Sequence, residues 1–465
     1  MIPTPVADII RITGAMVYGL PTDLLVSADI EVDSRLVVPG GLFVALPGQR
    51  SDGHDCAAAA VRAGAVAALT ARPIDGVPCL VVADPLAAVQ ELARRLYVAG
   101  QEPLTFGITG SSGKSSTAHL LATVLARLGP TLGPVGSYDE VGLPLTALRR
   151  ELDTRFAVLE YSARTPGHLG VQRSIVQPHA ATVLSVGADH AGGLLAALEG
   201  VDSAAINLLN ADDRLALALA PLTSEQVATF GTGPDADYRA EGVEQGDDGR
   251  ASFTLVTPQF GSAPVSLRLR GEHRVTSALA VAANVLGMGL WRSAEHVADL
   301  LSAAQPRSRW WLEVSERPDG VTVLDDARSA DPTSMRAALR TLAVLGAGKR
   351  RRTVAVLGPM AGLGEDARQA HIELGRYLVR LDLGQLLVVG PEAGGIHAGA
   401  VLEGSWGTES RHVPDVDAAI ALLRAELGPG DVVLVKAARS AGLTRVAAAL
   451  LAPPLGECPP MRPAQ

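Results

Sequence analysis

Short apolar runs separated by helical stretches form the main pattern in the middle third of this chain. The runs lie at residues 104–108, 156–161, 181–186, 204–209 and 226–230. A hairpin is expected at residues 252–269, and a helix at residues 274–286. Strands that alternate with helices are typical of a largely parallel sheet covered by helices on both faces.

The two flanking regions carry similar but separate patterns. In the N-terminal region, strand-like runs at residues 41–46 and 79–82 are each followed by a helical stretch, at residues 56–63 and 86–97. Beyond residue 305, strands are expected at residues 321–324, 353–357, 385–389 and 431–435, which indicates a smaller doubly wound domain.

Two linker-like segments divide the chain. They are Gly100–Pro103 and Gln305–Ser308, and a length of 465 residues predicts roughly three domains. We therefore expect an α/β protein with a small mixed α/β domain at residues 1–101, a P-loop-type parallel-sheet ATPase domain at 102–305 and a Rossmann-like domain at 306–465.

A glycine- and serine-rich turn follows the apolar run at residues 104–108 and opens a helical pattern that continues to Leu128. Backbone N–H groups and the helix dipole at such a turn bind phosphate, a lysine reaches the outer phosphates, and a serine hydroxyl binds Mg²⁺. The sequence predicts ATP and Mg²⁺ as cofactors, with these nucleotide-binding residues: Thr109, Gly110, Ser111, Ser112, Gly113, Lys114, Ser115 and Ser116.

Lysine is rare in this chain, which makes a functional role for Lys114 easier to argue. The three lysines are Lys114, Lys349 and Lys436, against 37 arginines. Arginine differs from lysine in shape, hydration and ability to lose a proton, so we expect a specific role for Lys114 and Lys436. The segment Lys349–Arg352 is more typical of a solvated turn.

Charge and composition exclude several classes of protein. A net charge of −9 argues against nucleic acid as the main partner, and the apolar runs are too short for a membrane helix. Residues 1–20 show no secretory signal, and the three cysteines lack metal-ligand spacing. We expect a cytoplasmic protein without a membrane or nucleic-acid partner.

The order of several motifs resembles the Mur ligase family, the ATP-dependent amide-bond-forming enzymes of peptidoglycan precursor synthesis. The phosphate loop has the short T-G-S-S-G-K-S-S form of that family. The C-terminal stretches look most like the members that add D-alanyl-D-alanine. The other matching segments are Asp33–Arg35, Pro39–Gly48, Asp52–His54, Gly142–Thr146, Glu160, Ala188–His190, Asn210–Asp213, Gly271–His273, Leu324–Asp326, Ser334–Met335, Val356–Gly364 and Leu434–Lys436.

The resemblance implies that ATP phosphorylates a substrate carboxylate and that an amine then displaces phosphate. The carboxylate is a small molecule, UDP-linked in the family, and the amine is an amino acid or dipeptide. Positioning and charge neutralisation dominate such phosphoryl transfer.

Each candidate residue receives a role from the same resemblance. Lys114 neutralises charge, Ser115 holds one Mg²⁺, and Glu160 and His190 hold a second. Without the resemblance, a strand-end carboxylate and a loop histidine are the simpler interpretations of Glu160 and His190. The implied nucleotide contacts are His273, Arg309 and Asp326, and the implied substrate contacts are Ser34, Arg35, Asp52, Gly53, His54 and Lys436.

The sequence also departs from the family. Most close relatives bridge metal and phosphate with a carbamylated lysine downstream of the His190 position, but no lysine lies between Lys114 and Lys349. Glu199 or Asp202 could supply an anion there, although a surface helix is the simpler interpretation of both.

The nucleotide-base positions and the last domain change as well. The family's His-Asn and Tyr-Asn pairs read His273-Arg274 and Arg328-Ser329, and Pro359 and Gly362 replace acidic residues. Three hypotheses stay open: a ligase similar to the D-alanyl-D-alanine-adding enzymes, a ligase of specialised metabolism, and a nucleotide-binding pseudoenzyme.

The missing lysine generates a prediction about CO₂. Arginine stays protonated and cannot form a carbamate. We expect the activity to be insensitive to depletion of bicarbonate, measured as initial rates in degassed and bicarbonate-supplemented buffer. A clear rescue by bicarbonate would show that Lys349 or Lys436 reaches the reaction centre, or that the segment after His190 aligns differently with the family.

Overall fold

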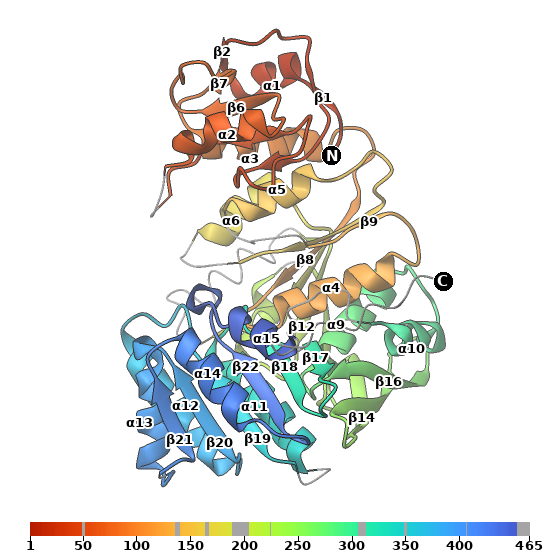
Figure 1. Cartoon of the computed structure of the whole chain (residues 1–465). Coiled ribbons are helices and arrows are strands. Elements are labelled where there is room, and N and C mark those ends of the chain that lie inside the picture. The colour runs from red at the N-terminus through yellow and green to blue at the C-terminus, as the bar shows by residue number, and fades with distance from the viewer. Residues whose placement is uncertain are drawn as a thin grey trace, which may run out of the picture. The chain divides into compact units, whose positions relative to one another are not determined.

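The computed structural model describes residues 1–48, 52–134, 140–162, 167–187, 204–223, 225–305, 313–347, 351–405 and 407–452. Three main sheets follow one another along the chain, in agreement with the predicted α/β class (Figure 1). The described residues form two compact units, one within residues 1–239, 256–261 and 276–297 and the other within residues 240–255, 262–275 and 298–452. The boundaries proposed at residues 101 and 305 stay predictions.

The N-terminal sheet is mixed, as expected. Its order is β2-β7-β6-β5-β4, in which β2 pairs antiparallel with β7 and the other pairs are parallel. The strands are β2 (Met16–Tyr18), β4 (Ile30–Glu31), β5 (Leu42–Val44), β6 (Ala67–Thr70) and β7 (Cys79–Val81), with a separate pair β1 (Thr4–Pro5) and β3 (Leu25–Val26). The helices are α1 (Val6–Thr13), α2 (Ala57–Arg62) and α3 (Pro85–Tyr97).

The central sheet has the order β16-β15-β14-β13-β12-β11-β8-β10-β9. From β13 to β9 all pairs are parallel, which confirms the predicted parallel sheet. The strands are β8 (Leu104–Thr109), β9 (Thr131–Leu132), β10 (Phe156–Glu160), β11 (Ala180–Val183), β12 (Ile206–Asn210), β13 (Gln226–Gly231), β14 (Tyr238–Gln245), β15 (Arg250–Val256) and β16 (Ser262–Arg270).

Helices connect these strands. They are α4 (Lys114–Leu125), α5 (Gly142–Leu148), α6 (His168–Ile175), α8 (Arg214–Leu217), α9 (Arg274–Gly287) and α10 (Ala294–Ala303). The helix after the phosphate loop ends at Leu125, three residues earlier than the apolar pattern predicted.

The C-terminal sheet is doubly wound, as predicted, with the order β17-β18-β22-β19-β20-β21. One hydrophobic cluster covers the face under α11, α12 and α13, and another covers the face under α14 and α15. The strands are β17 (Glu313–Glu316), β18 (Thr322–Asp326), β19 (Thr353–Leu357), β20 (Gln385–Val389), β21 (Ser410–Val413) and β22 (Val432–Lys436); the helices are α11 (Pro332–Ala347), α12 (Ala367–Arg380), α13 (Gly394–Leu402), α14 (Val416–Glu426) and α15 (Thr444–Leu451).

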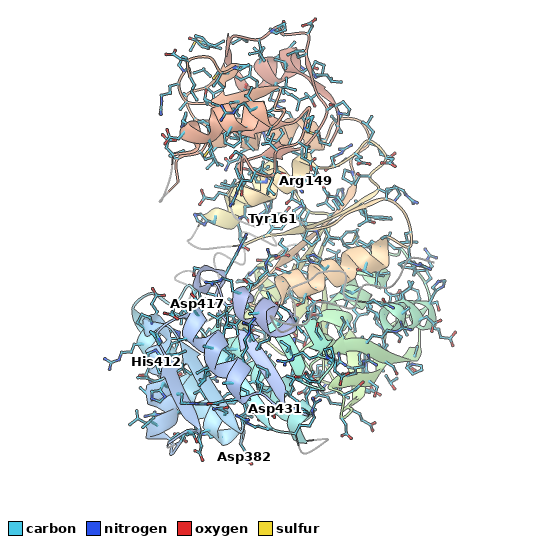
Figure 2. The ribbon with its side chains drawn as sticks, in the orientation of Figure 1. Arg149, Tyr161, Asp382, His412, Asp417 and Asp431 are labelled. Carbon is cyan, nitrogen blue, oxygen red and sulfur yellow. The ribbon has the colours of Figure 1, made fainter. Side chains whose placement is uncertain are left out.

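A buried arginine fixes the first linker to the central sheet region. Arg150, just beyond α5, is 1% exposed and donates to the backbone oxygens of Tyr97, Ala99 (2.9 Å) and Gln101 (3.1 Å). Tyr97 is the last residue of α3, and the carbonyls at a helix C-terminus have no partner within the helix itself. The neighbouring Arg149, which is labelled in Figure 2, pairs with Glu31 of β4.

Candidate functional site

The glycine- and serine-rich turn forms a tight loop between β8 and α4. Gly110 has φ 142° and Gly113, which precedes the first turn of α4, has φ 79°, both in the region that favours glycine. A Cβ at Gly110 would lie 3.0 Å from the Ser185 nitrogen. The loop therefore places the N-terminus of a twelve-residue helix at the end of a central parallel strand, the arrangement that binds phosphate.

Three functional groups converge at this helix N-terminus. The Lys114 Nζ donates to the Gly110 oxygen at 2.6 Å, so the ammonium group lies over the loop. The Ser115 hydroxyl donates to Glu160 Oε2 at 2.5 Å. The structure thus brings Lys114 and Ser115 together with Glu160, which lies 45 residues beyond Ser115 in the sequence.

The Ser115–Glu160 pair fits a Mg²⁺ ion. Glu160 is 2% exposed and ends β10 opposite Ile108 of β8, which aligns the carboxylate with the start of the phosphate loop. A carboxylate and a hydroxyl are hard oxygen ligands, and Mg²⁺ takes one or two carboxylates together with waters and phosphates. Among the described residues no group of three or more His, Cys, Asp or Glu side chains could hold a metal.

The remaining predicted residue of the metal site, His190, lies outside the described residues. The same holds for Arg309, Lys349, Glu199 and Asp202.

Sequence reasoning missed two residues that shape α4. His119 donates its Nδ1–H to the Ser115 oxygen at 3.0 Å, and burial lowers the pKa of its imidazole. Thr117 donates to the Ser277 hydroxyl at 3.1 Å, which links α4 to α9. The His119 bond lies within α4, whereas Thr117 acts through a residue 160 positions away, and neither contact has a recognisable sequence motif.

The N-terminal candidates form two compact turns. Arg35 binds the Asp33 carboxylate at 2.6 Å, and its hydrogen bonds lower the pKa of Asp33 to about 2. Ser34 lies between them. The Arg35 side chain is 85% exposed, so it is accessible to a ligand.

Asp52, Gly53 and His54 make a second turn with a clear structural role. His54 is 6% exposed, its Nδ1–H donates to Asp52 Oδ1 at 2.6 Å, and its Nε2 accepts from the Ala71 nitrogen at 3.0 Å. A Cβ at Gly53 would lie 2.6 Å from the Leu46 oxygen. Both ring nitrogens of His54 are engaged inside the domain, and a ligand role for this turn stays a prediction.

The C-terminal candidates gather at the carboxyl edge of their sheet. Lys436 is 2% exposed, and its Nζ donates to Asp326 Oδ2 at 2.6 Å and to the Ser329 oxygen at 2.8 Å. His273 belongs to the same compact unit; burial, and then the charges of Arg274 and Lys436, hold its imidazole pKa well below the usual value. The structure thus groups His273, Asp326 and Lys436.

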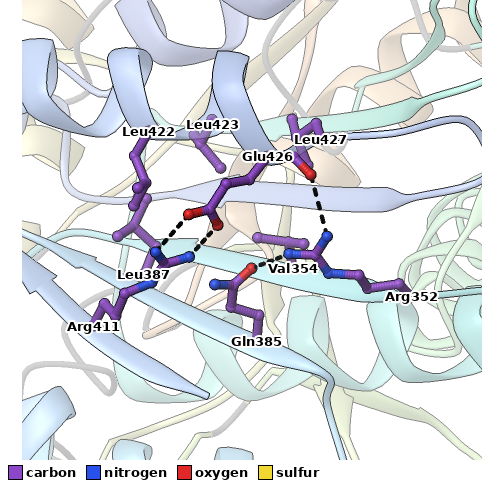
Figure 3. Close-up of a pocket in the computed structure, with 9 residues that line it drawn as sticks. All are labelled: Arg352, Val354, Gln385, Leu387, Arg411, Leu422, Leu423, Glu426 and Leu427. Carbon is purple, nitrogen blue, oxygen red and sulfur yellow. Dashed lines mark hydrogen bonds and ion pairs between the residues drawn. The ribbon is translucent and has the colours of Figure 1, made fainter. Parts of the chain in front are cut away.

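A depression between β19, β20, β21 and α14 lies elsewhere in the C-terminal domain (Figure 3). Its polar side chains bind one another: Arg411 pairs with Glu426 at 2.6 Å, and Arg352 donates to Gln385 at 2.5 Å. This cluster ties α14 to the sheet, and none of the residues that line it is a predicted site residue.

Three family models match the chain in the order of its sheets. They are the Mur ligase family, catalytic domain at residues 28–97, the Mur ligase middle domain at residues 108–285, and the Mur ligase, glutamate ligase domain at residues 311–439. The chain is also 43% identical to the UDP-N-acetylmuramoyl-tripeptide–D-alanyl-D-alanine ligase of Mycobacterium tuberculosis, over 97% of the chain and 98% of that protein. The chain belongs to the Mur ligase family.

Other relatives agree with this Mur ligase assignment. The enzyme of the same name from Escherichia coli is 33% identical over 90% of the chain and 93% of its own length. A crystal structure of MurF from Acinetobacter baumannii superposes with a TM-score of 0.81, 29% identity, and coverage of 97% of this chain and 99% of that chain. MurF of Thermotoga maritima in complex with ADP, at 23% identity and a TM-score of 0.73, has the same fold.

The family assignment settles the reaction class. This Mur ligase is an ATP-dependent carboxylate–amine ligase that uses ATP and Mg²⁺. Within the described part of the chain, no helix is both long and apolar enough to cross a membrane.

The buried Asp325 generates a prediction about pH. Burial raises the pKa of this carboxyl from 3.8 to about 6, so the folded chain keeps a proton that the unfolded chain releases near pH 4. The folded state is therefore favoured at pH 4 and loses stability as the pH rises through 6. Asp325→Asn keeps an acceptor for the Ala327 nitrogen and should be about 2–3 kcal/mol more stable than wild type at pH 8, with little difference at pH 4.

Thermal unfolding of both proteins at the two pH values measures this effect. The exposed Asp417→Asn is the matched control and should change stability by less than about 0.5 kcal/mol at either pH. A gain for Asp325→Asn that is equal at pH 4 and pH 8 would contradict the assignment.

Proposed function

We propose that this Mur ligase joins the carboxylate of a UDP-linked muramoyl tripeptide to the amine of D-alanyl-D-alanine. The observation that carries the proposal is the 43% identity, over nearly the whole chain, to a relative named for that reaction. The Asp33–Arg35 and Asp52–His54 turns support it, because both matching elements of the N-terminal domain are present and well formed.

The proposed roles follow from the geometry of the phosphate loop. Lys114 would neutralise charge on the β- and γ-phosphates. The Ser115 hydroxyl would hold one Mg²⁺, and the Glu160 carboxylate and His190 would hold a second. Mg²⁺ supplies neutralisation of charge on the phosphate oxygens. The substrate carboxylate takes the γ-phosphoryl group and ADP leaves; the amine then forms the amide bond and phosphate leaves.

The other candidates bind the rest of the substrates in this proposal. Ser34, Arg35, Asp52, Gly53 and His54 serve the UDP-sugar end of the carboxylate substrate. His273, Arg309 and Asp326 serve the nucleotide, and Lys436 serves the amine-bearing substrate. We also propose a cytoplasmic location, where ATP is available.

A second candidate is a ligase of specialised metabolism with a different carboxylate. Arg274, 7% exposed, replaces a family asparagine beside His273, and no lysine lies between Lys114 and Lys349, where the family has its metal-bridging carbamate. The intact cluster of Lys114, Ser115 and Glu160 favours catalysis over a nucleotide-binding protein without activity.

Calorimetry and turnover assays test both the ATP site and the substrate. Wild type should bind UDP-N-acetylmuramoyl tripeptide and convert it, with D-alanyl-D-alanine and ATP, to the amide product. Lys114→Ala should bind the UDP-linked peptide as wild type does but lose ATP turnover by about 10²-fold or more, because the phosphates lose a fixed cation. The exposed Arg94→Ala is the matched control and should keep wild-type rates.

Two results would contradict the proposal. If a folded Lys114→Ala protein turned over ATP at the wild-type rate, the assignment of the ATP site would be wrong. Binding of a free amino acid or peptide carboxylate, with no binding of the UDP-linked peptide, would favour the ligase of specialised metabolism.

A further inference from the structure

The segment Asn210–Asp213 at the end of β12 matches the family's motif order, but none of the roles above uses it. Two of its polar side chains, those of Asn210 and Asp213, bond to one neighbouring segment, and that of Asp212 bonds to another. Asn210 is 7% exposed, so its amide group is inside the protein and depends on internal partners.

Asn210 and Asp213 both bind the segment Leu184–Gly187, which follows β11. The Asn210 Nδ2 donates to the Leu184 oxygen at 2.8 Å. Asp213 Oδ2 accepts from the Val186 nitrogen at 3.3 Å, while its Oδ1 caps α8 by accepting from Leu215 (3.1 Å) and Ala216 (2.9 Å). One end of β12 thus holds the backbone of a neighbouring loop.

The segment Leu184–Gly187 in turn binds the phosphate loop. Ser111 and Ser112 donate their backbone N–H groups to the Ser185 oxygen (3.0 Å) and hydroxyl (3.2 Å). The Gly187 nitrogen donates to the Ser111 hydroxyl at 2.6 Å. The Cβ of Leu184 and the backbone of Ser185 also lie where a side chain at Gly110 would be.

We propose that Asn210 and Asp213 are positioning residues for ATP, acting through Leu184–Gly187 on the phosphate loop. A loop rich in serine and glycine loses much conformational freedom when it binds an anion. Hydrogen bonds that order the loop before binding reduce that loss and increase affinity. Because the bonds lie one layer behind the loop, neither side chain contacts the nucleotide.

Asp212 provides an internal control within the same motif. Its carboxylate accepts from the backbone nitrogens of Thr232 (2.8 Å) and Gly233 (3.2 Å), beyond β13 and on the side away from β11. Loss of this side chain removes a comparable set of hydrogen bonds without touching the path to the phosphate loop.

Calorimetry with a non-hydrolysable ATP analogue and Mg²⁺ tests the proposal on the full chain. Asp213→Ser keeps a cap for α8 but cannot also reach Val186, and Asn210→Ala removes the bond to Leu184. One lost hydrogen bond of about 1 kcal/mol corresponds to a roughly fivefold higher Kd for the analogue. The KM for ATP should rise by a similar factor, while the KM for the amine stays at the wild-type value.

The control variant Asp212→Ala separates an effect on ATP binding from a general loss of stability. Asp212→Ala should lower the unfolding temperature and leave the Kd for the analogue unchanged. If Asp213→Ser and Asn210→Ala unfold at lower temperature but bind the analogue as wild type does, the two residues are structural only and the proposal is overturned. An equal rise in Kd for Asp212→Ala would also overturn it.

The inference rests on the proposed ATP site, and Lys114→Ala separates the two. Loss of analogue binding in Lys114→Ala, together with wild-type binding in Asp213→Ser and Asn210→Ala, would leave the ATP site intact and reject only the positioning role. Wild-type binding of the analogue by Lys114→Ala would reject the ATP site itself.

Discussion

The parallel register between β8 and its two neighbours is the constraint on which the site depends. Ile108 lies opposite Glu160 on one side, and Thr109 lies opposite Val183 on the other. The strands β8, β10 and β11 consequently end at the same edge of the sheet. That edge carries the phosphate loop, the Glu160 carboxylate and the segment after β11. A register shift of one residue would turn Glu160 to the opposite face and separate it from Ser115.

Strong local patterns made much of the fold predictable. The runs at residues 353–357 and 385–389 are β19 and β20 with the predicted bounds, because buried parallel strands are almost continuously apolar. Other elements carried a weaker signal. The strand β14 mixes charged and apolar residues over Tyr238–Gln245, and β17 contains two glutamates in four residues, so neither was predicted.

The candidate site also has a part that the sequence predicts and a part that only the structure shows. The phosphate loop was predictable because its glycines and Lys114 are adjacent in the sequence, whereas its supports are not. Ser185 lies 73 residues from Ser112 and Ser277 lies 160 residues from Thr117, and a single serine has no local signature. The role of Asp52–His54 as an internal turn also required the structure, since the bond from Ala71 comes from a different strand end.

Charged residues lie close together in the C-terminal group of His273, Asp326 and Lys436. Burial lowers the pKa of Arg274, and the nearby charge of Asp326 partly opposes that shift. Lys436 is held by the same Asp326 carboxylate. The Asp326 carboxylate therefore interacts with two cations, Arg274 and Lys436.

The central claim is that this chain activates a carboxylate as an acyl phosphate. The direct measurement is isotope transfer: the carboxylate substrate is labelled with ¹⁸O in its reacting carboxyl group, and the inorganic phosphate released during turnover is analysed by mass spectrometry. The account predicts that each phosphate carries one ¹⁸O atom from the carboxylate. Unlabelled phosphate, released at the same rate as the amide product, would contradict it.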